Sequence, residues 1–124
     1  MNKKIIVWGR EFDLSINFDI YANECITETQ NKALENFLCR PDLIENAKEK
    51  VIAYCLKHNG NEIGSSIENI FKYVIPQSIY IQRAPDNTRT VGLMCAYKFN
   101  PDDGLAIVFK DEKLIAVGSQ NIIL

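Results

Sequence analysis

The chain has 124 residues, 47% of them apolar and 24% charged, and its formal net charge is −2. A chain of this length forms one domain, residues 1–124, and its apolar content excludes intrinsic disorder because enough surface can be buried in a core. The slightly negative charge weighs against direct binding of nucleic acid, and no run approaches the roughly 20 apolar residues that a membrane span needs.

Two strands are predicted at the N-terminus. Residues 3–8 form a short apolar run, and residues 12–20 then alternate strictly between apolar and polar side chains. The apolar phase of this alternation consists of Phe12, Leu14, Ile16, Phe18 and Ile20. A period of two places these side chains on one face of a strand, against a core, and the polar side chains on the other face. Because Gly9 and Arg10 follow the first run directly, the two strands are expected to form a hairpin.

Two helices are predicted after this hairpin. Thr27 and Gln30 have the spacing of a capping box, in which each side chain bonds a free backbone N–H at the start of a helix. This helix is expected to end at about Cys39, and Pro41 then opens a second helix. The apolar stripe of the second helix consists of Leu43, Ile44, Ala47, Val51, Tyr54 and Cys55. We expect it to end near Gly60, because a glycine there can adopt the left-handed conformation that terminates helices.

The C-terminal half predicts a short helix followed by a train of strands. The helix is expected to begin at Ser66 and to end before Pro76, with Ile67, Ile70, Phe71 and Val74 at helical spacing. Four apolar runs then lie at residues 78–83, 89–99, 105–109 and 113–118, with turn-forming residues at 85–87, 100–104 and 111–112. Gly92, inside one of these runs, predicts a bulge or a close approach of the backbone.

The predicted elements follow the order β-β-α-α-(α)-β-β-β-β. Strands gather at both ends of the chain and the helices lie between them. This order predicts an α+β fold, in which a mainly antiparallel sheet is covered by helices packed on one face.

The residues that most often carry chemistry are sparse. His58 is the only histidine, and its place near a helix end favours a structural role, because an imidazole there can bond free carbonyls. Cys55 lies on the apolar stripe, so we expect it to face the core rather than to form a catalytic dyad with His58. The acidic turn at residues 100–104 lacks the ligand pattern of a calcium loop. We therefore predict no catalytic residue, no metal, no cofactor and no enzyme activity.

The cysteines and the N-terminus bear on the cellular compartment. Cys25, Cys39, Cys55 and Cys95 show no paired spacing of the kind that zinc ligands have. We expect them to be reduced, and most of them to act as small apolar residues. The apolar run at residues 5–8 is too short for a secretory signal. These features predict a cytoplasmic protein.

Charge is distributed unevenly along the chain. Residues 11–49 carry nine acidic and three basic side chains, a net charge of −6, whereas the rest carries 11 basic and seven acidic ones, a net charge of +4. Solvated helix and strand faces are one interpretation of this asymmetry. The other is an acidic surface that attracts a basic partner protein. The candidate residues for such a surface are Glu11, Asp13, Asp19, Glu24, Glu28, Asp42, Glu45 and Glu49.

The C-terminal segment resembles the closing segment of a group of small, uncharacterised bacterial α+β domains. These domains share a hairpin with a Pro-x-x-Gly-Leu-Ala pattern and a Gly-x-Gln-Asp-Ile ending. The matching residues here are Asn100, Pro101, Gly104, Leu105, Ala106, Gly118, Gln120 and Ile122. Asn121 replaces the expected aspartate, and Asp103 replaces a histidine that many relatives carry. The opening hairpin is also similar, so the resemblance covers about half of the chain in two blocks.

Members of this group resemble immunity proteins of bacterial toxins, including those of contact-dependent growth inhibition systems. The resemblance implies a protein that binds and neutralises a cognate toxin, which is expected to be basic. We expect a monomer or a weak homodimer with no direct contact with nucleic acid or membrane. Two alternatives remain open. One is a small enzyme or ligand-binding domain that uses His58 and Cys55, and the other is a homodimeric subunit that pairs the strand at residues 12–20 across its edge.

Overall fold

The N-terminal hairpin is present in the structure, a computed structural model that describes residues 1–84 and 86–124. Strands β1 (Asn2–Val7) and β2 (Arg10–Phe18) pair antiparallel. The two residues between them, Trp8 and Gly9, have φ angles of 48° and 84°. Positive φ at both positions is typical of the two-residue turn whose twist matches that of paired strands. The predicted alternation is confirmed within β2, where Leu14 and Ile16 are buried and Asp13 and Asn17 are exposed.

Both predicted helices form, and the capping box is present in full. Helix α1 (Glu28–Leu38) begins after Thr27, whose hydroxyl accepts from the N–H of Gln30 while the Gln30 side chain accepts from the N–H of Thr27. Helix α2 (Asp42–Ile63) begins after Pro41, as expected. The predicted stripe faces the core: Leu43, Ile44, Ala47, Val51 and Cys55 are buried, and Tyr54 is half-buried.

The prediction that α2 ends near Gly60 is confirmed in part, because the regular helix is interrupted there but does not end. The helix is kinked at Asn59, where φ is −136°, but continues to Ile63. The Oδ1 of Asn59 accepts a hydrogen bond of 2.6 Å from the hydroxyl of Tyr97, which holds the kinked residue against the sheet. The terminating glycine is Gly64, with φ at 110°, and its N–H bonds the carbonyl of Gly60.

The predicted third helix was largely wrong. It is reduced to a single 3₁₀ turn, η1 (Ile70–Lys72), which is capped by Asn69 and not by Ser66. The residues expected at its end belong to strand β3 (Val74–Ile81). Pro76 is tolerated in this strand because the register shifts between Pro76 and Ser78, and because the pairing of β3 with β2 begins only at Ser78.

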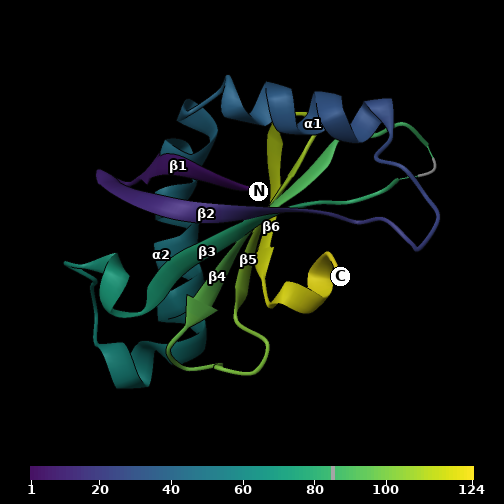
Figure 1. Ribbon diagram of the computed structural model, residues 1–124. Coiled ribbons are helices and arrows are strands. Elements are labelled where there is room, and N and C mark those ends of the chain that lie inside the picture. Colours follow the sequence, from purple (N-terminus) through teal and green to yellow (C-terminus); the bar gives the residue numbers. More distant parts are fainter. Residues whose placement is uncertain (85) are drawn as a thin grey trace.

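The remaining strands form a meander. Strands β4 (Thr90–Tyr97), β5 (Leu105–Lys110) and β6 (Lys113–Gly118) pair antiparallel in turn, and a second 3₁₀ turn, η2 (Gln120–Ile122), closes the chain. In the six-stranded sheet the spatial order equals the chain order, and among the strands of the described residues only β2 and β3 are parallel neighbours. This arrangement, seen in Figure 1, confirms the predicted α+β fold. Of the expected turn at residues 85–87, Pro85 lies outside the described residues.

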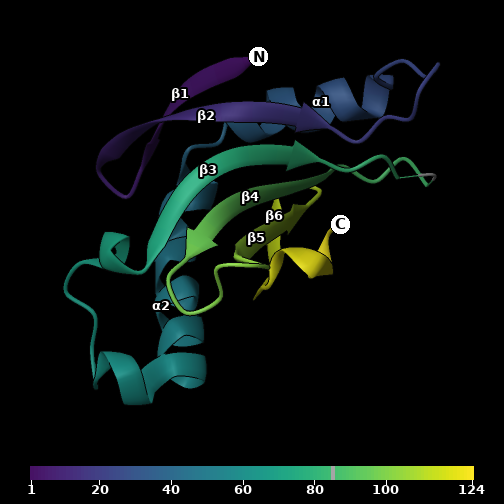
Figure 2. The same ribbon diagram turned by 60° about the horizontal axis from the view of Figure 1, so that its bottom comes forward.

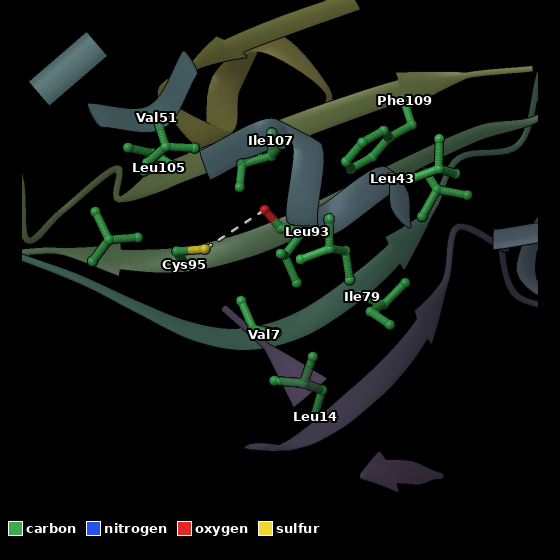
Figure 3. Close-up of a cluster of buried hydrophobic side chains, with 14 of the residues drawn as sticks. Val7, Leu14, Leu43, Val51, Ile79, Leu93, Cys95, Leu105, Ile107 and Phe109 are labelled. Atoms are coloured by element: carbon green, nitrogen blue, oxygen red, sulfur yellow. Dashed lines mark hydrogen bonds between the residues drawn. The ribbon is translucent and has the colours of Figure 1, made fainter. Parts of the chain in front are cut away.

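The two faces of the sheet are covered differently. In Figure 2 both helices lie behind the sheet and the C-terminal turn lies in front of it. The main core is formed between the helices and the sheet by side chains such as Leu14, Val51, Ile79, Leu93 and Phe109 (Figure 3). On the other face, Ile123 packs with Met94, Ala106 and Val108. Gly92 makes room for this second cluster, because a Cβ there would lie 2.9 Å from the Cδ1 of Ile123. The prediction of a bulge or a close backbone approach was wrong, since the register is regular at Gly92 and the atoms nearest to it are side-chain atoms of Ile123 and Met94.

Candidate functional site

Cys55 and His58, on which the enzyme hypothesis depends, have different environments in the structure. Cys55 is wholly buried, as predicted, and burial raises the pKa of its thiol. His58 is exposed, and its ring stacks on Tyr54 with 4.2 Å between the ring centroids. Among the described residues no hydrogen bond joins Cys55 to His58. The expected contact of His58 with helix-end carbonyls does not form either, because α2 continues past it to Ile63.

The acidic turn between β4 and β5 has a structural explanation, as expected. The N–H of Gly104 donates to the carbonyl of Asn100 at 2.8 Å, and Gly104 has a φ of 60°. Asp102 and Asp103 are exposed at the tip of the turn. Within residues 1–84 and 86–124, no three His, Cys, Asp or Glu side chains gather in a way that could hold a metal ion.

The residues behind the family resemblance come together at this same turn. The side-chain amide of Gln120 donates to the carbonyl of Cys95 at 3.1 Å, and the N–H of Gln120 donates to the carbonyl of Asp103 at 3.0 Å. A Cβ on Gly104 would lie 2.6 Å from that carbonyl of Cys95. The shared pattern therefore fastens the C-terminal turn to the β4–β5 hairpin. Asn121 is exposed.

One of the eight candidate acidic residues holds the N-terminal hairpin. Glu45, in the first turn of α2, accepts a hydrogen bond of 3.1 Å from the N–H of Trp8. The indole N–H of Trp8 donates to the carbonyl of Ile44 at 2.8 Å. These two bonds fix a tryptophan with positive φ, and they connect the β1–β2 turn to the start of α2. Glu45 therefore has a structural role.

Three more of the acidic residues bond their own chain. Glu24 forms an ion pair of 3.2 Å with Arg83, and Asp19 accepts from the N–H of Arg83. Asp42 forms a two-bond pair with Arg40, which lowers the pKa of the Asp42 carboxyl. Asp42 and Glu45 also lie in the first turn of α2, where negative charge is favoured by the helix dipole. Part of the charge asymmetry is thus explained by folding.

The other four acidic residues are exposed and lie on three elements. Glu28 begins α1, Glu49 lies on α2, and Glu11 and Asp13 lie on β2. The eight predicted residues therefore do not form one continuous surface. Glu11 and Asp13 are the exception, because they are two positions apart on one strand and point to the same side of the sheet.

Glu11 and Asp13 belong to a part of the sheet that no helix covers. Register pairs Glu11 with Ile6 and Asp13 with Lys4, so these side chains share the face opposite to α1 and α2. The C-terminal turn packs over β4 and β5 and leaves β1 and β2 uncovered on this side. We call this region the open sheet face; it consists of Asn2, Lys4, Ile6, Glu11, Asp13, Ser15 and Asn17. Ile6, which pairs with Glu11 at the hairpin end of this face, is 54% exposed.

The strand proposed for homodimer pairing is not an edge of the sheet. β2, which covers most of residues 12–20, pairs with β1 on one side and with β3 on the other. The edges are β1 and β6. A dimer formed through a free edge at β2 is therefore inconsistent with this fold.

The cysteines divide into two classes. All four are free; Cys55 and Cys95 are buried, whereas Cys25 and Cys39 are exposed. The expectation of small apolar residues is confirmed for the buried pair. In the part of the chain that the structure describes, neither helix is long and apolar enough to cross a bilayer.

Comparison with known proteins gives a family. No curated protein matches the chain, and no solved structure matches it. A family model described as "Domain of unknown function (DUF6985)" matches residues 2–124, which include every helix and strand of the fold. The chain therefore belongs to the DUF6985 family.

Proposed function

We propose that this protein is a protein-binding module of the cytoplasm, an immunity-type protein that binds and neutralises a basic toxin domain. The open sheet face carries this proposal. An exposed isoleucine, Ile6, lies beside Glu11 and Asp13 on a rigid pair of strands, and neither a helix nor the C-terminal turn covers it. An exposed apolar side chain next to charged groups is an arrangement by which protein surfaces bind a partner.

The chemistry of the face supports a protein as the partner. Ile6 offers apolar area, which another protein's side chain can bury. Glu11 and Asp13 outnumber Lys4, which shares this face, so its net charge is negative. A negative face repels phosphates and attracts lysine and arginine side chains, which are frequent on toxins that act on nucleic acids. In this proposal the protein performs no reaction, and it acts by covering a surface of the toxin.

Co-expression tests the proposal. Each open reading frame adjacent to this gene is expressed in a heterologous bacterium, with and without this protein, and growth is measured. The proposal expects one product that arrests growth alone and is neutralised by this protein. If none of the neighbouring products is toxic, or if a toxic product is not neutralised, the proposal is wrong.

The surface is tested on the purified pair by charge reversal. The double variant Glu11→Lys/Asp13→Lys is expected to lower the association rate by about tenfold or more at low salt, because electrostatic attraction acts mainly on this rate. The matched control is Asp102→Lys/Asp103→Lys, which makes the same charge change at the exposed β4–β5 turn. If both double variants lower the association rate equally, the net charge of the protein, and not this face, directs binding.

A further inference from the structure

A groove of about 420 Å³ lies at the opposite edge of the sheet, between α2 and β6. Its lining consists of Lys50, Ala53, Tyr54, Lys57, Leu114, Ile115, Ala116 and Val117. Apart from the two lysines, these side chains are aliphatic or aromatic, and in the described part of the chain no acidic side chain lines the groove. Among the described residues neither lysine forms an ion pair.

The helical wall of the groove has a regular pattern. Lys50, Ala53, Tyr54 and Lys57 occupy positions i, i+3, i+4 and i+7 of α2 and thus share one face of the helix. At a rise of 1.5 Å per residue, the two lysines are about 10.5 Å apart along the axis. Tyr54 is held between His58 and Tyr97, at centroid distances of 4.2 and 6.1 Å. The Tyr54 ring is therefore already held in place before anything binds.

The strand wall is formed by a bulge. Ala116 pairs with Val108, and Leu114 pairs with Phe109, so Ile115 has no partner across the β5–β6 ladder. Its side chain is 55% exposed. A bulge at the edge of a sheet interrupts the row of free N–H and C=O groups on which an added strand would pair. The groove is therefore poorly suited to an extended peptide that binds by strand addition.

We propose that this groove binds an acidic amphipathic helix of a partner protein. Two carboxylates seven residues apart on such a helix match the spacing of Lys50 and Lys57, and two apolar side chains between them meet Ala53 and Ile115. A second copy of the chain is a worse match, because it would bring its own lysines against these two. Nucleic acid matches the lysines but leaves the exposed isoleucine without an apolar contact.

This inference is independent of the proposed immunity function. The groove lies at β6, whereas the open sheet face lies on β1 and β2 at the other side of the sheet. The partner chemistry is also opposite, since a basic rim here selects an acidic partner. The failure of either proposal therefore leaves the other unaffected.

The test uses a labelled synthetic helix. A peptide of about 18 residues, long enough to form a helix, contains Glu-x-x-Leu-Leu-x-x-Glu at its centre. We expect it to bind with a submillimolar Kd in fluorescence anisotropy and to shift the amide NMR signals of Ala53, Ile115 and Ala116. In Lys50→Glu/Lys57→Glu the affinity should fall by about tenfold, since each ion pair is replaced by a repulsion. A peptide with lysines in place of both glutamates should recover binding to this variant.

The matched control is Lys32→Glu/Lys72→Glu, which changes the same charge at two exposed lysines that do not line the groove. It should bind the acidic peptide within about twofold of the wild type, since distant surface charges act weakly. The proposal is overturned if the peptide does not bind or shifts signals elsewhere. It is also overturned if both double variants lose the same amount of affinity for the acidic peptide, or if an oligonucleotide displaces the peptide with equal affinity. A third contrary result would be a dimer in sedimentation that dissociates in Lys50→Glu/Lys57→Glu.

Discussion

Glu45 accepts a hydrogen bond from the backbone N–H of Trp8, which lies 37 residues earlier in the chain. The bond joins the turn of the first hairpin to the first turn of α2, and the indole of the same tryptophan bonds the neighbouring carbonyl of Ile44. An acidic residue that the sequence offers as a partner contact is thus used inside the molecule.

Removal of this carboxylate should destabilise the fold. In Glu45→Ala the N–H of Trp8 loses its acceptor, and we expect the free energy of unfolding to fall by about 1–2 kcal/mol. Glu49→Ala removes the same side chain from an exposed position of the same helix and should change stability by less than about 0.5 kcal/mol. Urea denaturation followed by the fluorescence of Trp8, the only tryptophan, measures both. Equal losses would show that the bond to Trp8 contributes nothing.

Gly104 should tolerate no side chain. Its φ is 60°, and an added Cβ would lie 2.6 Å from the carbonyl oxygen of Cys95 and 2.7 Å from the Nε2 of Gln120. Gly104→Ala is expected to cost about 2–4 kcal/mol, from left-handed strain and overpacking together. Gly60→Ala is the control: beyond its own turn of helix no atom lies within 4 Å of an added Cβ, and alanine in a helix should stabilise by about 0.5–1 kcal/mol. If thermal or urea denaturation shows that both substitutions change the free energy of unfolding in the same direction, the tight fit at Gly104 does not explain why this turn has a glycine.

Thiol reactivity should separate the four cysteines into two pairs. Cys25 and Cys39 are exposed and should react with a thiol reagent in the folded protein. Cys55 and Cys95 are wholly buried, and burial raises the pKa of both thiols, so they should react only after unfolding. Mass spectrometry after limited labelling measures the pattern. Early labelling of Cys95 would mean that the sheet opens without global unfolding.

Stability should fall at alkaline pH. Burial, and secondarily the nearby Asp19 carboxylate, raises the pKa of Tyr80 to about 12 from its ordinary value of 10.0. Since the folded state keeps this proton where the unfolded state releases it, the stabilisation is complete below pH 10 and is lost as the pH rises from 10 toward 12. Tyr80→Phe should flatten the decline of unfolding free energy across this window. An unchanged slope would show that Tyr80 does not contribute to the alkaline loss.

Local signals in the sequence were sufficient for much of the fold. The alternation in β2, the Thr27–Gln30 capping box and the turn residues between β4 and β5 each act through neighbours in sequence, and each appears as predicted. The segment before β3 shows where such signals fail. Ile67, Ile70, Phe71 and Val74 have helical spacing, but Val74 is buried in a strand between β2 and β4. Contacts with the neighbouring strands determine the conformation of Val74, and the spacing of apolar residues carries no information about these contacts.

The candidate site was less predictable for a related reason. Composition identifies acidic residues but does not show which of them the chain uses internally. Glu45 and Glu49 look equivalent on one helix, and only the folded hairpin distinguishes them by bringing Trp8 to Glu45. The groove between α2 and β6 had a partial signal, since Lys50 and Lys57 flank an apolar pair at helical spacing. Its second wall depends on the bulge at Ile115, which sequence periodicity does not reveal.

The parallel pairing of β2 with β3 has a consequence for biosynthesis. Residues 19–73 separate the two strands, so the first hairpin leaves the ribosome long before the neighbour that completes its sheet. Until then the backbone N–H and C=O groups on one side of β2 lack their β3 partners, and unpaired strand edges of this kind associate with other chains. Nascent chains that stall or terminate ahead of β3 are therefore expected to aggregate, and chaperone demand should be highest while the two helices are being translated.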